Sequence, residues 1–470
     1  MKFCLVTLAF LAAKLNAAPV AIDEVEMSSP DAPGAHFRGD DADQAYHTIT
    51  PHPKDHFRGD DADQVYHTIT PHRKDHFRGD DADQVYHTII PHPRDVSGDH
   101  SRGDDGDQVY HTITPHPKDH FRGDDADQVY HTITPHDEPF AKETHVYVPR
   151  QTTDISLDVY TSKQGQMPSP IMLWFHGGYL ITGSRIAIPD WLLNFAYDQG
   201  WTVVSPDYRV LPESTGLATI EDLQSAYRWV AKELPCIHRE CDANRIILAG
   251  ASAGGWCAVV NAMLVTDPAS CAGLPLPRAL FLIYPIVDIG SEKWAKSFTI
   301  PDSHVDSETK HHLLQDIPLR IARREASLGE DFPTSEEELK TRKRLPLLYS
   351  VMEEGRLLDY LTGLSGFAAR RMASGLERTI LRDPTVQKLF PLSCAFSSEY
   401  PSTVIVHGTA DRGVSSEESE TLLQKLQSAG LAAQYFPESG ADHAFDIGWE
   451  EPNDTMRSAL RALQGIVCNK

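Results

Sequence analysis

The sequence has little positive charge, few cysteines and no long apolar run after its first residues. Lysine and arginine number 43 against 67 acidic residues, and the formal net charge of −24 argues against nucleic acid or an anionic membrane as a partner. Because no stretch of 18 or more apolar residues follows the N-terminus, we expect no transmembrane segment. A hydrophobic content of 41% over 470 residues still supports a sizeable core.

The first 17 residues resemble a secretory signal peptide. Lys2 supplies a positive charge, residues 3–13 form a short apolar stretch, and Ala17 is a small residue where cleavage is expected. We therefore expect a secreted, extracellular protein. Six cysteines remain after cleavage, an even number that permits disulfides, and Cys236 and Cys241 are the pair that the spacing favours.

Residues 18–138 form a low-complexity region with five near-identical units of 20 residues, interrupted once by a short insertion. The units begin at His36, His56, His76, His100 and His120. Each unit offers few apolar side chains, while prolines recur and acidic residues cluster, so folding would not offset the lost chain entropy. We therefore predict a disordered region rather than a solenoid.

The repeated units contain motifs that are known to bind partner proteins or metal ions in other contexts. An Arg-Gly-Asp triplet recurs in every unit, as at residues 58–60, and the spacing of His47 and His52 admits weak binding of Zn²⁺ or Cu²⁺. Protonation of its three histidines would change the net charge of the first unit from −2 to +1. The motifs recur because one unit was copied, so their recurrence does not by itself indicate binding. The favoured interpretation of the repeats is therefore a solvated spacer. No preformed metal site is expected, and no partner is assigned to this region.

The pentapeptide at residues 250–254 has the form G-x-S-x-G. It lies between an apolar stretch at 245–249, predicted as a buried strand, and an apolar stretch at 255–264, predicted as a helix. A strand, a sharp turn and a helix are the context of a nucleophile elbow, which makes Ser252 the candidate nucleophile. The N–H of Ala253, at the start of the helix, would then face a developing oxyanion.

A serine nucleophile requires a base, an acid that orients the base, and an oxyanion hole. Asp411 follows an apolar strand predicted at 403–406, and His443 lies in a loop after the last predicted strand. The chain order Ser252, Asp411, His443 is that of the α/β-hydrolases. These three residues are the predicted catalytic triad, and neither a metal nor a cofactor is expected.

The predicted oxyanion loop follows another apolar strand, at 171–175. Its residues are Gly177, Gly178 and Tyr179. Glycines let backbone N–H groups approach a substrate without hindrance, so this loop and Ala253 are predicted to form the oxyanion hole. His176, directly before the loop, is predicted to support it rather than to act as a base.

From about residue 139 the apolar pattern indicates an α/β fold. Two alternating stretches, 144–150 and 155–161, predict an antiparallel pair of strands. Later apolar stretches alternate with helical ones, which predicts a mostly parallel sheet with helices on both faces. A long segment from about 289 to 400, with helical stretches interrupted by Pro346 among others, predicts a cap that sets substrate choice.

Three motifs together resemble the hormone-sensitive-lipase-like branch of the α/β-hydrolases. They are His176-Gly177-Gly178-Tyr179, Asp207-Tyr208-Arg209-Val210-Leu211-Pro212-Glu213 and Gly250-Ala251-Ser252-Ala253-Gly254-Gly255. The resemblance covers residues 140–470 and implies the α/β-hydrolase fold and hydrolysis of carboxylic esters through an acyl-serine. Two positions depart from the family pattern: Tyr179 stands where a third glycine is usual, and Ala251 where an aspartate is usual.

The predicted function is that of a secreted serine hydrolase acting on small-molecule carboxylic esters. Two alternatives stay open. One is a serine peptidase or amidase on the same fold. The other is a protein whose function lies in its repeats, as binding arms or as a peptide precursor, with a secondary hydrolase domain at 139–470.

Overall fold

The computed structural model describes residues 140–150, 153–162, 168–267, 273–300, 303, 305–323, 327–333, 338 and 341–468, together with 65–66 and 85–86. In the repeat region the described residues are two short strands, β1 (Val65–Tyr66) and β2 (Val85–Tyr86), which pair in parallel. Equivalent positions of successive units lie opposite each other in this pair. The predicted signal peptide and the remainder of the repeats lie outside the described residues, so their predictions stay open.

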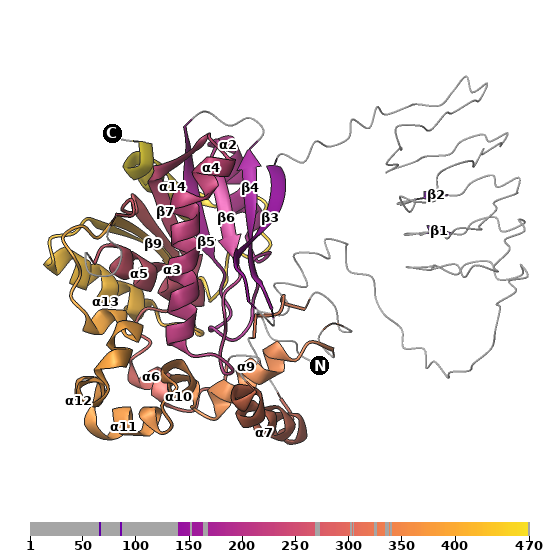
Figure 1. Ribbon diagram of the computed structural model, residues 1–470, viewed down its shortest axis with the longest axis vertical. Helices are drawn as coiled ribbons and strands as arrows, with labels where there is room; N and C mark the ends of the chain where they lie inside the picture. The colour runs from indigo at the N-terminus through magenta and orange to yellow at the C-terminus, as the bar shows by residue number, and fades with distance from the viewer. Residues whose placement is uncertain are drawn as a thin grey trace, which may run out of the picture. The chain divides into compact units, whose positions relative to one another are not determined.

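From Phe140 onward the chain is built on an eight-stranded sheet with the strand order β10-β9-β8-β7-β5-β6-β4-β3 (Figure 1). β3 pairs antiparallel with β4 and β4 antiparallel with β6, while every other neighbouring pair is parallel. The strands are β3 (Phe140–Val148), β4 (Ile155–Ser162), β5 (Ser169–Phe175), β6 (Thr202–Pro206), β7 (Cys241–Ala251), β8 (Ala279–Ile283), β9 (Ser402–Gly408) and β10 (Ala433–Glu438). This is the predicted α/β-hydrolase fold, including its initial antiparallel pair.

Helices cover both faces of the sheet, and the central strands are therefore apolar on both sides. In β5, Ile171 and Leu173 belong to one buried cluster, whereas Met172 and Trp174 belong to the other. One face is covered by α3 (Gly216–Lys232), α5 (Ala253–Val265) and α13 (Ser416–Ser428), and the other by α2 (Asp190–Asp198) and α14 (Asp454–Cys468). No helix in the described part of the chain is long and apolar enough to cross a membrane.

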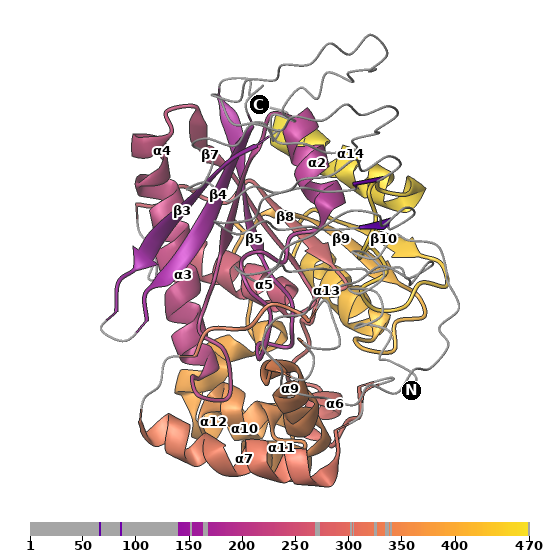
Figure 2. The ribbon, with the colours of Figure 1, turned by 90° about the vertical axis from the view of Figure 1, so that its right-hand side faces the viewer.

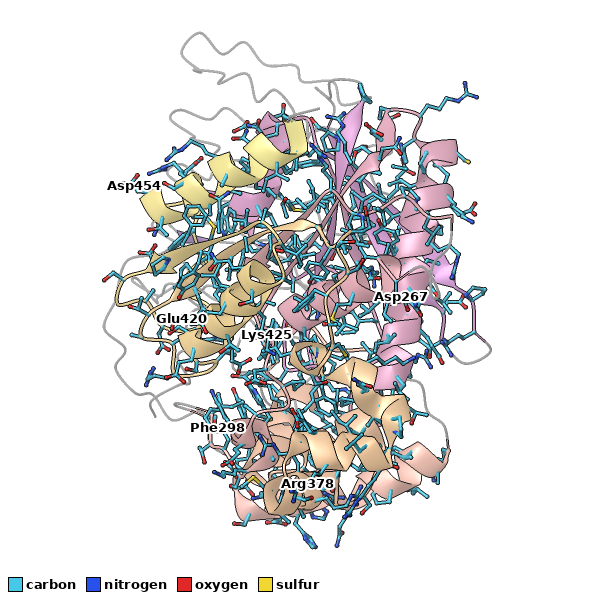
Figure 3. The ribbon with its side chains drawn as sticks, turned by 90° about the vertical axis from the view of Figure 1, so that its left-hand side faces the viewer. Asp267, Phe298, Arg378, Glu420, Lys425 and Asp454 are labelled. Atoms are coloured by element: carbon cyan, nitrogen blue, oxygen red, sulfur yellow. The ribbon has the colours of Figure 1, made fainter. Side chains whose placement is uncertain are left out.

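The segment between β8 and β9 forms a helical layer at one end of the sheet (Figure 2). Its helices are α6 (Glu292–Ala295), α7 (Ser307–Ala322), α9 (Arg344–Glu353), α10 (Leu357–Thr362), α11 (Phe367–Ser374) and α12 (Leu376–Arg382). Figure 3 shows this layer from the opposite side, with Arg378 on α12. The helical stretch predicted to be interrupted at Pro346 breaks at residues 342–343, and Pro346 lies in the first turn of α9, where proline is tolerated. Further interruptions fall at Gly355 and Gly363.

The favoured disulfide between Cys236 and Cys241 is not formed, and both cysteines are free thiols. Cys241 is buried, with its Sγ 3.4 Å from Oγ1 of Thr202. Cys236 is exposed, and its Sγ donates to the carbonyl oxygen of Lys232. The two thiols therefore face different surroundings, and their short separation in sequence does not bring them together.

Candidate active site

Ser252 lies at the turn between β7 and α5 with φ 56° and ψ −121°, a conformation that is rare for a residue with a side chain. The flanking residues are small for a steric reason. A Cβ atom at Gly250 would lie 2.3 Å from the carbonyl oxygen of Gly254, and one at Gly254 would lie 1.9 Å from that of Phe175. The close packing of α5 against β5 and β7 therefore explains the G-x-S-x-G pattern.

The three residues of the predicted triad lie together at the carboxyl ends of β7, β9 and β10. Oγ of Ser252 lies 3.0 Å from Nε2 of His443, and Nδ1 of the same ring lies 2.7 Å from Oδ2 of Asp411. These distances allow the serine hydroxyl to donate to Nε2 while Nδ1–H donates to the carboxylate. The arrangement can remove a proton from Ser252 and hold it on His443.

Asp411 is fixed by its own loop. Its Oδ1 accepts the N–H groups of Gly413 and Val414 at 2.8 and 2.7 Å, and its Oδ2 also lies 3.1 Å from Nε2 of the buried His407. Burial by itself would raise the pKa of Asp411, but the interaction with His443 and these hydrogen bonds outweigh it and hold the pKa well below its usual range. The carboxylate is therefore ionised whenever a histidine base is neutral.

The predicted oxyanion loop has the unusual backbone that such a loop requires. The φ angles of Gly178, Tyr179 and Leu180 are 108°, 54° and 62°. A Cβ at Gly178 would lie 2.2 Å from the carbonyl oxygen of Thr182, so only glycine fits there. The loop closely approaches the nucleophile, since a Cβ at Gly177 would lie 3.3 Å from that of Ser252.

The structure places His176 as a support for this loop. The buried ring is stacked on Tyr208, with centroids 4.2 Å apart, and its Nδ1 lies 2.8 Å from the carbonyl oxygen of Gly177. The hydroxyl of Tyr208 donates to the carbonyl oxygen of His176 at 2.7 Å. Ala253, the remaining predicted oxyanion residue, is the first residue of α5, where N–H groups have no acceptor within the helix.

The cap insertion contacts the oxyanion loop through backbone groups. The carbonyl oxygen of Glu330 accepts the N–H of Gly183 at 2.9 Å and the hydroxyl of Thr182 at 3.1 Å. The carbonyl oxygen of Ser327 accepts the N–H of Val210, in the motif that follows β6. The cap therefore fixes the loop that is predicted to bind the oxyanion, a contact that sequence reasoning did not find.

Glu213 binds two cap helices, a structural role that the sequence did not predict. Its buried carboxylate lies 2.8 Å from Nη1 of Arg344 in α9 and 2.9 Å from Nη2 of Arg320 in α7. Arg344 also donates to the carbonyl oxygen of Leu211 at 2.9 Å. No local pattern signals these contacts, because the cap arginines lie more than a hundred residues away along the chain.

A second buried carboxylate, Glu418 in α13, binds the segment that leads into the cap. It accepts the N–H groups of Val287 and Asp288, both at 2.8 Å, and Nε1–H of Trp294 at 3.0 Å. Burial raises the pKa of Glu418 to about 7, although these three hydrogen bonds oppose the increase. Trp294 in turn contacts the ring of Tyr179, with centroids 6.0 Å apart, so this carboxylate supports the surroundings of the site.

Two comparisons concern relatives identified by sequence. A non-reducing polyketide synthase, ascC of Acremonium egyptiacum, is 27% identical over 321 residues, which cover 66% of this chain and 14% of that protein. The probable carboxylesterase M8 of Phoma sp. is 36% identical over 111 residues, which cover 22% of this chain and 35% of that protein. The match therefore spans a minor part of each relative.

Among solved structures, esterase B from Lactobacillus rhamnosis is 16% identical, with 70% of this chain and 86% of that chain covered and a TM-score of 0.47. A Pyrobaculum calidifontis esterase is 18% identical, with 70% of this chain and 85% of that chain covered and a TM-score of 0.45.

Residues 172–324 match the model of a family described as alpha/beta hydrolase fold. Together with the sheet and the elbow described above, this match shows that the region from Phe140 onward has the α/β-hydrolase fold.

Proposed function

We propose that this protein hydrolyses carboxylic esters of small molecules with Ser252 as nucleophile, His443 as general base and acid, and Asp411 as the residue that orients the histidine. The observation that carries the proposal is the continuous hydrogen-bonded series from Ser252 through His443 to Asp411, with distances of 3.0 and 2.7 Å. It is supported by the likeness to a relative that is named a probable carboxylesterase.

In the acylation step, Nε2 of His443 accepts the proton of Ser252 while Oγ forms a bond to the ester carbonyl carbon. The ionised Asp411 stabilises the resulting imidazolium, which then donates its proton to the departing alcohol as the ester C–O bond breaks. Water attacks the acyl-serine by the same route in reverse, giving the acid and free Ser252.

The negative oxygen of each tetrahedral intermediate would be bound by the backbone N–H groups of Gly178, Tyr179 and Ala253. A donor of this kind contributes on the order of 10²- to 10³-fold in rate. Because Gly177 approaches Ser252 closely, the loop is near enough to serve this role. The signal-like first 17 residues support an extracellular site of action.

Hydrolysis of p-nitrophenyl esters from acetate to palmitate, with a matched series of p-nitroanilides, tests the proposal. We expect ester turnover by the intact protein and a loss of about 10⁴-fold or more in the Ser252→Ala variant. Ser225→Ala, a serine of α3 that bonds only within its helix, is the matched control and should keep full activity. Cleavage of anilides without esters would instead establish an amidase, and equal ester turnover by both variants would exclude Ser252 as the nucleophile.

A further inference from the structure

Two potential metal ligands lie on the edge strand of the sheet, away from the triad. Glu143 and His145 are two positions apart on β3, so their side chains are on the same face of the strand. The residues between and before them point to the other face, where Thr144 and Lys142 contact Asp158. The strand therefore presents a carboxylate and an imidazole side by side.

A third potential ligand, His238, comes from the loop between α4 (Leu234–Ile237) and β7. The backbone of this loop is fixed by hydrogen bonds. The N–H of His238 donates to the carbonyl oxygen of Leu234 at 2.7 Å, and its own carbonyl oxygen accepts the N–H of Cys241 at 3.0 Å. The carbonyl oxygen of Glu240 accepts the N–H of Ser169 in β5 at 2.6 Å. The position of His238 relative to the sheet is thus determined by the fold.

The three side chains converge on one point. Oε2 of Glu143 lies 3.3 Å from Nε2 of His145 and 3.4 Å from Nε2 of His238, and all three atoms lie within 4.8 Å of one another. Tetrahedral Zn²⁺ with bonds of about 2.0–2.2 Å separates its ligand atoms by roughly 3.4 Å. The separations match those of atoms that share a metal. The contact between His145 and Glu143 is also a hydrogen bond, but at 3.3 Å it is longer than the usual 2.9 Å or so.

The surroundings of the His238 ring support a metal site independently of these distances. Its Nε2 is shielded from solvent and has no hydrogen-bond partner among the described residues. A buried nitrogen without a hydrogen bond is costly, and a metal ion would remove that cost. Its other nitrogen, Nδ1, lies 3.3 Å from Oε1 of Glu240, the arrangement in which a carboxylate orients a metal-binding histidine. His145 is positioned by Trp229, whose ring centroid lies 5.2 Å away.

We propose that Glu143, His145 and His238 bind a Zn²⁺ ion, with Glu240 as the residue that orients His238. Two imidazoles and one carboxylate are ligands that Zn²⁺ accepts, and solvent completes the fourth position because Glu143 is half exposed. The two carboxylates balance the charge of the ion. Bound metal joins the edge strand β3 to the loop before the central strand β7, and so stabilises the hydrolase region independently of its catalytic residues.

The full-length protein is suited to a direct test because all seven tryptophans lie between residues 174 and 449, outside the histidine-rich repeats. Tryptophan fluorescence therefore follows unfolding of the hydrolase region even if the repeats also bind metal. Melting curves of EDTA-treated protein would be recorded against increasing Zn²⁺. We expect Zn²⁺ to raise the melting temperature of the natural sequence, with an apparent affinity that can be read from the titration.

His238→Gln and Glu143→Gln should each weaken the apparent Zn²⁺ affinity at least a hundredfold, and Glu240→Gln by about tenfold to a hundredfold. His312→Gln, on the exposed surface of the cap helix α7, is the matched control and should behave as the natural sequence. Glu143 is half exposed, so its variant is expected to fold even if the His238 variant does not. An unchanged Zn²⁺ response in both ligand variants, or no response of the natural sequence to Zn²⁺ at about 100 times the protein concentration, would overturn the proposal.

Discussion

The loop that carries Asp411 and the junction between the sheet and the cap both depend on a buried carboxylate, yet they hold it differently. Asp411 is bound by N–H groups of its own loop, two and three residues further along the chain. Glu213 is bound by guanidinium groups of two cap helices that lie far away in the sequence. The first arrangement forms locally and presents a candidate catalytic group, whereas the second forms only when the cap docks.

The largest effect that this comparison predicts is on catalysis. Asp411→Asn keeps the size of the side chain but removes the charge that orients His443, so we expect kcat for ester hydrolysis to fall by about 10⁴-fold with the fold retained. Asp442→Asn is the matched control, since Asp442 binds backbone N–H groups of Arg412 and His443 but not the histidine ring. Steady-state kinetics with circular dichroism would decide; an Asp411 variant with native activity would contradict the assigned role.

The next effect concerns stability of the junction. Replacing Arg344 by Met leaves Glu213 buried with one of its two cationic partners, and we expect a loss of about 3 kcal/mol in the free energy of unfolding. Lys296→Met is the matched control in the same cap, because its ion pair with Glu292 is exposed and should contribute far less to stability. Urea unfolding followed by tryptophan fluorescence measures both, and equal losses would show that burial of the ion pair is not what matters.

A pH-dependent effect of similar size is expected at Glu418, which lies beside Asp288 and Lys293 where the chain enters the cap. Because burial raises its pKa in the native state to about 7 from an ordinary value of 4.5, its contribution to stability is complete below about pH 4.5 and is lost as the pH rises through 7. The change is on the order of 3 kcal/mol. Glu418→Gln should flatten this part of the stability curve between pH 5 and 8.

The exposed Glu420 of α13 offers a control, labelled in Figure 3. Glu420→Gln should leave the pH dependence of the free energy of unfolding unchanged. The difference in unfolding free energy between the natural sequence and each variant, taken at each pH, isolates the contribution of one carboxylate from those of the other titrating residues. A Glu418 variant with the natural pH dependence would show that this carboxylate is ionised in the native protein throughout the range.

Much of the sheet and of the candidate site was accessible from sequence because the signals are short and periodic. The apolar stretches at 171–175 and 245–249 are strands, and the elbow occupies the predicted turn. The disulfide prediction failed because two cysteines five positions apart have different surroundings once β7 enters the sheet. The interruption predicted at Pro346 falls just before it, at residues 342–343, because a proline fits the first turn of a new helix.

The sequence by itself determined the α/β fold, the elbow and the chain order of the predicted triad, since each depends on spacing that local backbone geometry enforces. Only the tertiary structure decided that Glu213 anchors the cap, that Glu330 fixes the predicted oxyanion loop, and that His238 meets Glu143 and His145. These contacts join segments far apart in the chain, and their partners are ordinary charged residues in ordinary stretches. Nothing in a local pattern marks them, because what makes them specific is burial and distance, which arise only when the chain has folded.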